Sequence, residues 1–154
     1  MNLRKYFIEH CELEDYDINQ NQISIIDDLK KYYVENFKQN LIVKFFKKKD
    51  IKLGFYLMGD VGVGKTMILN FFFNKLNEKK IRLHFNEFMI KFHNFIFDNK
   101  DKDNGIDLFV KDLSKNTKLI YFDEFQVTNI VDAMILGKLF EKMFKENIKI
   151  ILTS

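Results

Sequence analysis

The sequence of 154 residues has no proline, no tryptophan, one cysteine (Cys11) and only two arginines, Arg4 and Arg82. A single cysteine excludes an intrachain disulfide framework and fits a reducing compartment. No apolar run approaches the ~18–20 residues that a membrane-spanning helix needs. The first 17 residues include several acidic side chains and lack the apolar core of a signal peptide. We therefore expect a cytoplasmic protein without a transmembrane segment.

The rest of the composition is that of one globular domain. Hydrophobic residues make up 47% and charged residues 31% of the chain, which is close to the average for folded proteins. The net charge of +3 is too small to indicate a nucleic-acid partner by itself, so nucleic acid is not expected as a partner.

The spacing of apolar residues predicts helices that alternate with short buried strands. An amphipathic helix is expected over residues 22–39, within an N-terminal helical segment at 1–50. Strands are expected at residues 53–58, 82–85, 119–122 and 148–153, and helices at 65–79, 87–97, 105–115 and 130–143. This alternation predicts an α/β fold with a parallel sheet flanked by helices.

One segment matches the phosphate-loop motif G-x-x-x-x-G-K-[ST] in full. Its residues are Gly59, Asp60, Val61, Gly62, Val63, Gly64, Lys65 and Thr66, between a predicted strand and a predicted helix. Backbone N–H groups of the loop and the helix N-terminus are expected to wrap a phosphate. Lys65 is expected to reach the β- and γ-phosphates, and the Thr66 hydroxyl to ligate Mg²⁺. The competing interpretation is a glycine-rich turn that binds nothing.

Two adjacent carboxylates, Asp123 and Glu124, follow the apolar run at residues 119–122. A carboxylate at the carboxyl end of a strand beside a phosphate loop can hold the Mg²⁺ shell, usually through water, and this is the role expected for Asp123. Glu124 is placed to orient and deprotonate an attacking water. Without a phosphate loop, such a pair would more often be a solvated turn.

The nucleotide is expected to be ATP, because the features of a GTPase are missing. The run Asn99-Lys100-Asp101-Lys102 lacks the final aspartate of a guanine-reading motif. The residue three positions after Asp123 is Gln126, where a γ-phosphate-sensing switch would have glycine.

Four stretches resemble the ZapE/AFG family of AAA+ P-loop ATPases: GFYLMGDVGVGKTMILNFFF, IRLHFNEFM, LIYFDEFQVTNIVDAMILGKLF and IILTS. Bacterial members of this family are associated with cell division, and mitochondrial members with protein quality control. The resemblance implies an AAA+ domain over residues 51–154 that binds ATP at 59–66 and Mg²⁺ through Thr66 and Asp123, with Lys65 and Glu124 as catalytic residues. It also implies a ring of subunits that remodels a protein partner. Arg82 and His84 belong to a family signature whose chemical role is not evident from the residues.

The resemblance further implies that the domain is truncated after its fourth strand. The family continues with a sensor asparagine, an arginine finger, a fifth strand and a helical lid, and neither Arg4 nor Arg82 occupies a finger position. We therefore expect slow hydrolysis by this chain alone and a tendency to associate through an open sheet edge. Two alternatives stay open. One is a nucleotide-binding module without turnover, and the other is a helicase-loader-type AAA+ ATPase that binds single-stranded DNA.

Overall fold

A computed structural model describes residues 2–38, 51–60 and 62–154. Val61 of the predicted phosphate loop and the basic segment before the first strand lie outside the described residues. The chain divides into two compact units, which are Met1–Lys52 with Gly59–Asn77 and Leu53–Met58 with Glu78–Ser154. None of the helices in the described ranges is both long enough and apolar enough to cross a membrane.

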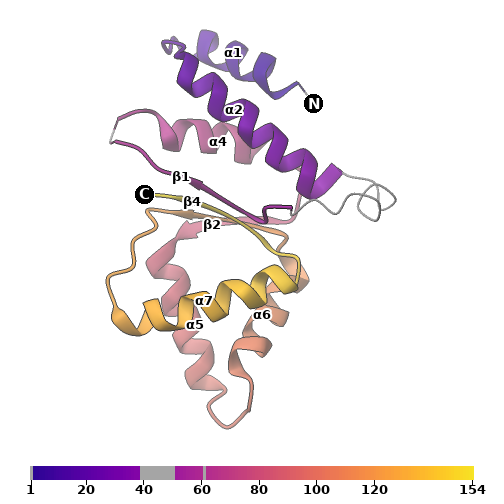
Figure 1. The fold of residues 1–154 in the computed structure, drawn as a ribbon, viewed down its shortest axis with the longest axis vertical. Helices are drawn as coiled ribbons and strands as arrows, with labels where there is room; N and C mark the ends of the chain where they lie inside the picture. Colours follow the sequence, from indigo (N-terminus) through magenta and orange to yellow (C-terminus); the bar gives the residue numbers. More distant parts are fainter. Residues whose placement is uncertain (1, 39–50, 61) are drawn as a thin grey trace. The chain divides into compact units, whose positions relative to one another are not determined.

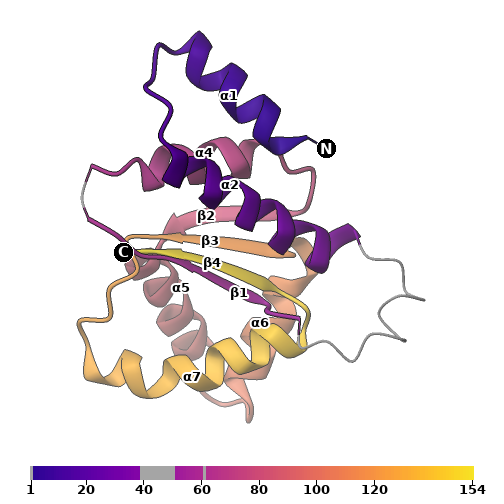
Figure 2. The ribbon, with the colours of Figure 1, turned by 45° about the horizontal axis from the view of Figure 1, so that its top comes forward.

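The second unit contains a parallel four-stranded sheet, as predicted. Its strands are β1 (Gly54–Leu57), β2 (Lys80–His84), β3 (Leu119–Asp123) and β4 (Lys149–Thr153). They lie in the order β1-β4-β3-β2, so among the described residues β1 and β2 are the outer strands (Figure 2). Because all four strands run in the same direction, their carboxyl ends lie at one edge of the sheet.

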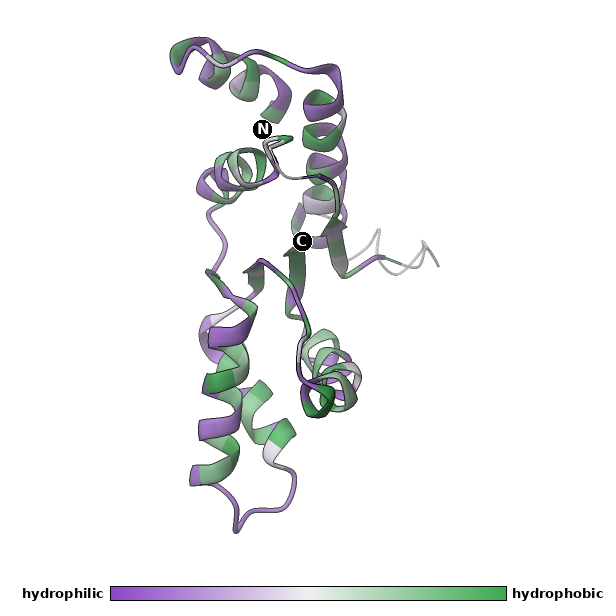
Figure 3. Cartoon of the chain, turned by 90° about the vertical axis from the view of Figure 1, so that its left-hand side faces the viewer, coloured by the Kyte–Doolittle hydropathy of each residue, from purple (hydrophilic) through white to green (hydrophobic). Residues whose placement is uncertain are grey.

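Three helices of the second unit pack on one face of this sheet. They are α5 (Phe85–Asp98), α6 (Gly105–Asn116) and α7 (Ile130–Lys145) (Figure 1). Leu83, Ile120 and Phe122 point into the core that these helices cover. Phenylalanines dominate that core, and the rings of Phe88 and Phe122 lie 4.7 Å apart between centroids. Figure 3 shows hydrophobic residues concentrated in the strands and hydrophilic residues interspersed on the helices.

Side chains alternate between the two faces of a strand, so alternate residues of β2 and β3 lie on opposite faces of the sheet. Residues 81, 83, 120 and 122 face the core, so residues 82, 84, 121 and 123 share the opposite face. The registers of β2 with β3 and of β3 with β4 then bring Arg82, Asp123 and Thr153 to one region of that face.

The first unit is helical. It contains α1 (Leu3–Leu13), α2 (Gln20–Tyr33), a π-helical turn η1 (Val34–Lys38) and α4 (Lys65–Lys75). The helix predicted over 22–39 therefore consists of α2 and η1, whereas α1 was not predicted. Buried residues at four-residue steps on α1 include Phe7, whose ring lies 5.2 Å from that of Phe71 on α4.

Most element boundaries differ from the prediction by one or two residues, and the end of α4 differs by four. Helix α4 ends at Lys75 instead of residue 79, because Leu76 adopts an extended backbone with φ −86° and ψ 141°. Strand β2 begins at Lys80, two residues earlier than predicted, because Lys80 and Ile81 pair with Leu119 and Ile120 of β3.

Candidate active site

The phosphate loop joins β1 to α4, and two of its glycines adopt a left-handed backbone. Gly62 has φ +89° and Gly64 has φ +82°, values that glycine reaches without the steric penalty of a side chain. Gly64 is also the N-cap of α4. A Cβ at Gly64 would lie 2.9 Å from Nε2 of Gln22, whereas a Cβ at Gly62 would meet no described atom within 4 Å. The loop conformation therefore depends on glycine at both positions.

Lys65 opens helix α4, and its side chain turns back over the loop. Its ammonium group donates hydrogen bonds to the carbonyl oxygens of Gly59 and Asp60, the latter at 2.9 Å. The positive charge of Lys65 thus lies against the loop, at the N-terminus of α4. The first N–H groups of a helix have no intrahelical partner, and they carry part of the positive end of the helix dipole. This donor set suits a phosphate group.

Thr66 is the second residue of α4, and it is exposed. It borders a surface hollow of the first unit together with His10, Tyr16 and Phe71. The rings of His10 and Phe71 stack with centroids 5.3 Å apart. Thr66 is accordingly accessible to solvent rather than packed into the protein.

Gln22, in the first turn of α2, is a loop contact that the sequence motif does not reveal. Its Nε2 donates to the carbonyl oxygen of Val63 at 3.4 Å. Its Oε1 is buried, and no hydrogen-bond partner for it is present among the described residues. Gln22 ties the N-terminal helices to the phosphate loop.

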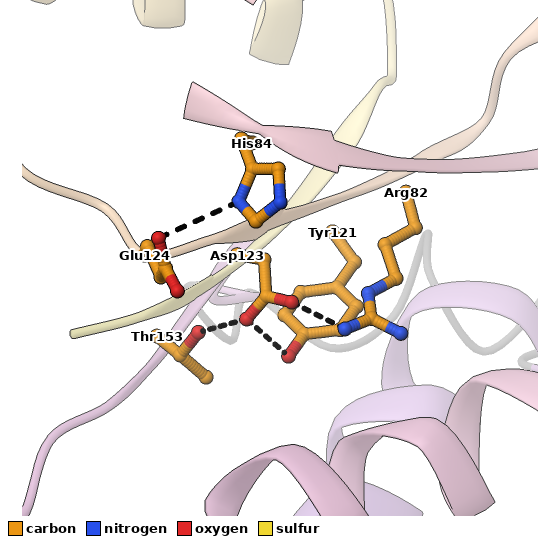
Figure 4. A network of polar contacts seen from close by, with 6 residues as sticks. All are labelled: Arg82, His84, Tyr121, Asp123, Glu124 and Thr153. Carbon is orange, nitrogen blue, oxygen red and sulfur yellow. Dashed lines mark hydrogen bonds and ion pairs between the residues drawn. The ribbon is translucent and has the colours of Figure 1, made fainter. Parts of the chain in front are cut away.

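Asp123 and Glu124 leave the end of β3 in different directions (Figure 4). Asp123 is the last residue of the strand and is 8% exposed. Glu124 has φ +52°, and its side chain is 82% exposed. One carboxylate Oε2 of Glu124 lies 3.7 Å from Nδ1 of His84, which ends the neighbouring strand β2. The adjacent carboxylates therefore occupy two different environments, one enclosed and one open to solvent.

Three side chains from three strands donate to the carboxylate of Asp123 (Figure 4). Oδ1 accepts hydrogen bonds from the Tyr121 hydroxyl at 3.1 Å and from the Thr153 hydroxyl at 3.2 Å. Oδ2 accepts from the guanidinium of Arg82, which also forms an ion pair with it. The same guanidinium lies over the ring of Tyr121, with 5.1 Å between Cζ and the ring centroid.

These contacts determine the charge of the network. Burial by itself would raise the pKa of Asp123, but the hydrogen bonds from Arg82, Tyr121 and Thr153 and the positive charge of Arg82 outweigh it, so the pKa lies below its ordinary value. Burial raises the pKa of Tyr121 to about 12, and the charge of Asp123 adds to this increase. At neutral pH the aspartate is therefore ionised, and the tyrosine is a neutral hydrogen-bond donor.

The sequence-predicted residues fall into two groups. The residues of 59–66, apart from Val61, form the loop and the start of α4, while Asp123 and Glu124 sit at the end of β3. The chain enters the loop two residues after β1 ends, and β1 and β3 end at the same edge of the sheet. Sequence reasoning missed Tyr121 and Thr153 and assigned no contact to Arg82. Tyr121 lies two residues before Asp123 on β3, and Arg82 is paired with Tyr121 on β2. Thr153 follows the pair of Phe122 with Leu152 and so lies level with Asp123 on β4. These positions were the signal for all three.

Comparison with known proteins gives the family. A family model described as AFG1-like ATPase matches residues 2–154. The chain is 34% identical over 113 residues to the cell division protein ZapE of Escherichia coli (strain K12), which covers 70% of this chain and 30% of that protein. It is 39% identical over 113 residues to lactation elevated protein 1 homolog B of Danio rerio, which covers 66% of this chain and 22% of that protein.

A third relative is an uncharacterized protein of Schizosaccharomyces pombe, 33% identical over 139 residues, covering 86% of this chain and 30% of that protein. The aligned part is thus between 22% and 30% of the length of each of these relatives. The family model, by contrast, matches this chain over nearly its whole length. The chain belongs to the AFG1-like ATPase family.

Proposed function

We propose that this chain binds Mg·ATP at the phosphate loop and hydrolyses it to ADP and phosphate. The observation that carries the proposal is the Lys65 ammonium, held against the carbonyl groups of a loop whose glycines have positive φ, at the N-terminus of α4. Membership of an ATPase family supports the same reading.

Each residue of the two groups has a task in this proposal. Lys65 and the backbone N–H groups bind the β- and γ-phosphates, and Thr66 and Asp123 hold Mg²⁺. When bound, Mg²⁺ neutralises charge that develops on the phosphate oxygens. A carboxylate offers about four acceptor positions, and three described donors occupy the carboxylate of Asp123. While Arg82 bonds to Oδ2, one position is left for a water, in agreement with a water-mediated role of Asp123.

Glu124 is the proposed base. Its exposed carboxylate can accept the proton of an attacking water, which the enclosed carboxylate of Asp123, occupied by three donors, is less able to do. The different surroundings of the two neighbouring carboxylates thus favour different roles, in which Asp123 holds the metal ion and Glu124 accepts the proton.

We further propose that hydrolysis drives the remodelling of a protein partner by a ring of subunits. One relative is named a cell division protein, and the ATPase family is compatible with oligomers. A partner of the division machinery is therefore part of the proposal.

The test is phosphate release under single-turnover conditions with protein in excess, because this measures the chemical step apart from product release. Removing a general base typically lowers a rate ~10²–10⁴-fold, so we expect Glu124→Gln to retain Mg·ATP binding and lose at least ~100-fold in rate. Glu146→Gln, an exposed glutamate at the end of α7, is the control and should match the wild type. Equal rates for Glu124→Gln and the wild type would contradict the proposed base.

A further inference from the structure

Asp123 carries a buried negative charge, and the structure shows how that charge is balanced. Within the described ranges its one cationic partner is Arg82, which reaches it from the adjacent strand β2. The other two donors, Tyr121 and Thr153, are neutral hydroxyls. A buried carboxylate without a counter-charge is strongly unfavourable, so Arg82 does for Asp123 what a metal ion would otherwise do.

The two oxygens of the carboxylate are used differently. Tyr121 and Thr153 both donate to Oδ1, whereas Arg82 bonds to Oδ2. Losing the arginine contact would therefore leave Oδ1 with both of its hydroxyl donors. The aspartate would keep its orientation while Oδ2 became available.

Arg82 also has the means to move. Its side chain is 36% exposed, against 11% for Asp123, so it is partly in contact with water. Its guanidinium lies over the Tyr121 ring, a contact that is independent of Asp123. The arginine can thus leave Oδ2 while it remains against the ring.

We propose that Arg82 is an exchangeable counter-ion, which bonds to Asp123 in the absence of metal and releases Oδ2 when Mg²⁺ binds, alone or with nucleotide. This inference rests on the proposed function, because it takes Asp123 as a magnesium residue. The guanidinium and the metal repel each other when they share one carboxylate. Arg82 therefore stabilises the metal-free protein and opposes metal binding.

The experiment compares thermal unfolding of the wild type and Arg82→Gln in EDTA, in Mg²⁺ alone and in Mg²⁺ with a fixed ADP concentration. Sodium chloride matches the ionic strength throughout, and ADP removes turnover from the measurement. The matched control is Arg4→Gln, since Arg4 pairs with Asp27 at 3.7 Å with both side chains about half exposed.

We expect Arg82→Gln to melt at a lower temperature than the wild type in EDTA. This gap in melting temperature should close as Mg²⁺ is added with ADP. The Mg²⁺ concentration for half of the full shift should fall roughly tenfold in Arg82→Gln, which corresponds to the loss of one charge-assisted contact. Arg82→Lys retains the charge and should stay near the wild type. Any effect of Arg4→Gln should not depend on Mg²⁺.

A gap that persists or widens in both Mg²⁺ series would overturn the exchange and make Arg82 a fixed structural partner. If Arg82→Gln shows no cooperative melt in EDTA, the proposal requires Mg²⁺ with ADP to restore one, and the absence of rescue would overturn it. If ADP does not change the melting temperature of the wild type while the gap closes in Mg²⁺ alone, the proposed nucleotide binding is refuted and the exchange is supported.

Discussion

Asp123→Asn tests whether the charge of this carboxylate holds the second unit together. The asparagine retains an oxygen that can accept from Tyr121 and Thr153, so the variant removes chiefly the charge that pairs with Arg82. Helices α5, α6 and α7 pack on the opposite face of the sheet and should be undisturbed.

The magnitude follows from that single lost interaction. A hydrogen bond between charged groups contributes ~1.5–3 kcal/mol. Because the Arg82 side chain is 36% exposed, solvent screens part of this energy, and we expect a loss of about 1–2 kcal/mol at pH 7. For a chain of this length, that corresponds to a melting temperature lower by roughly 2–8 °C.

The pH dependence gives the sharper test. The pKa of Asp123 is lower in the folded protein than its ordinary value of ~3.9, so its contribution is complete above about pH 5 and is lost as the pH falls through the folded pKa. Asparagine does not titrate. The difference in the free energy of unfolding between wild type and Asp123→Asn should therefore be constant from pH 5 to 8 and shrink below about pH 4.

Urea unfolding across this pH range measures the difference. The control is Asp112→Asn, which breaks an exposed pair with Lys115 on α6 and should change stability by no more than ~0.5 kcal/mol. If Asp123→Asn were as stable as the wild type at pH 7, or if the difference did not change between pH 7 and pH 3, the electrostatic account of the network would be wrong.

Three further substitutions probe the hydrogen-bond network and the loop separately. Tyr121→Phe should lower the free energy of unfolding by about 1 kcal/mol. In an alkaline absorbance titration it should remove the tyrosine that ionises at about pH 12. A wild-type titration that is complete well below pH 12 would argue against the buried hydroxyl. Gly64→Ala should lower the free energy of unfolding by about 1–2 kcal/mol because of its left-handed backbone, and it should also displace Gln22. Urea unfolding should therefore show a larger loss of stability than for Gly62→Ala, whose added methyl meets no described neighbour. Equal losses would mean that the Gln22 contact contributes nothing.

Much of the fold could be predicted because its signals are local. Strands β1, β3 and β4 contain short apolar runs, β2 alternates apolar and polar residues, and each helix of the second unit has an apolar face. These patterns can be recognised from neighbouring residues alone. The boundaries were less predictable, because pairing with another strand decides them, as it does for Lys80 at the start of β2. Helix α1 was missed although Leu3, Phe7 and Cys11 mark its buried face, since three positions in 11 residues give a weak pattern.

The candidate site divides in the same way. The phosphate loop could be located because its residues are consecutive and each has a defined task. The partners of Asp123 could not, because Arg82 is 41 residues away in the sequence and Thr153 is 30 residues away. Only the register of three parallel strands brings them together on one face.

The central claim, that the loop binds nucleotide phosphate through Lys65, is tested most directly by thermal unfolding with and without Mg·ATP. At 100 times its dissociation constant the ligand should stabilise the wild type by ~2.7 kcal/mol, a rise of roughly 5–11 °C in melting temperature. Lys65→Ala should fold like the wild type and show no such rise. An equal rise in Lys65→Ala, or no rise in a wild type that melts cooperatively, would contradict the account.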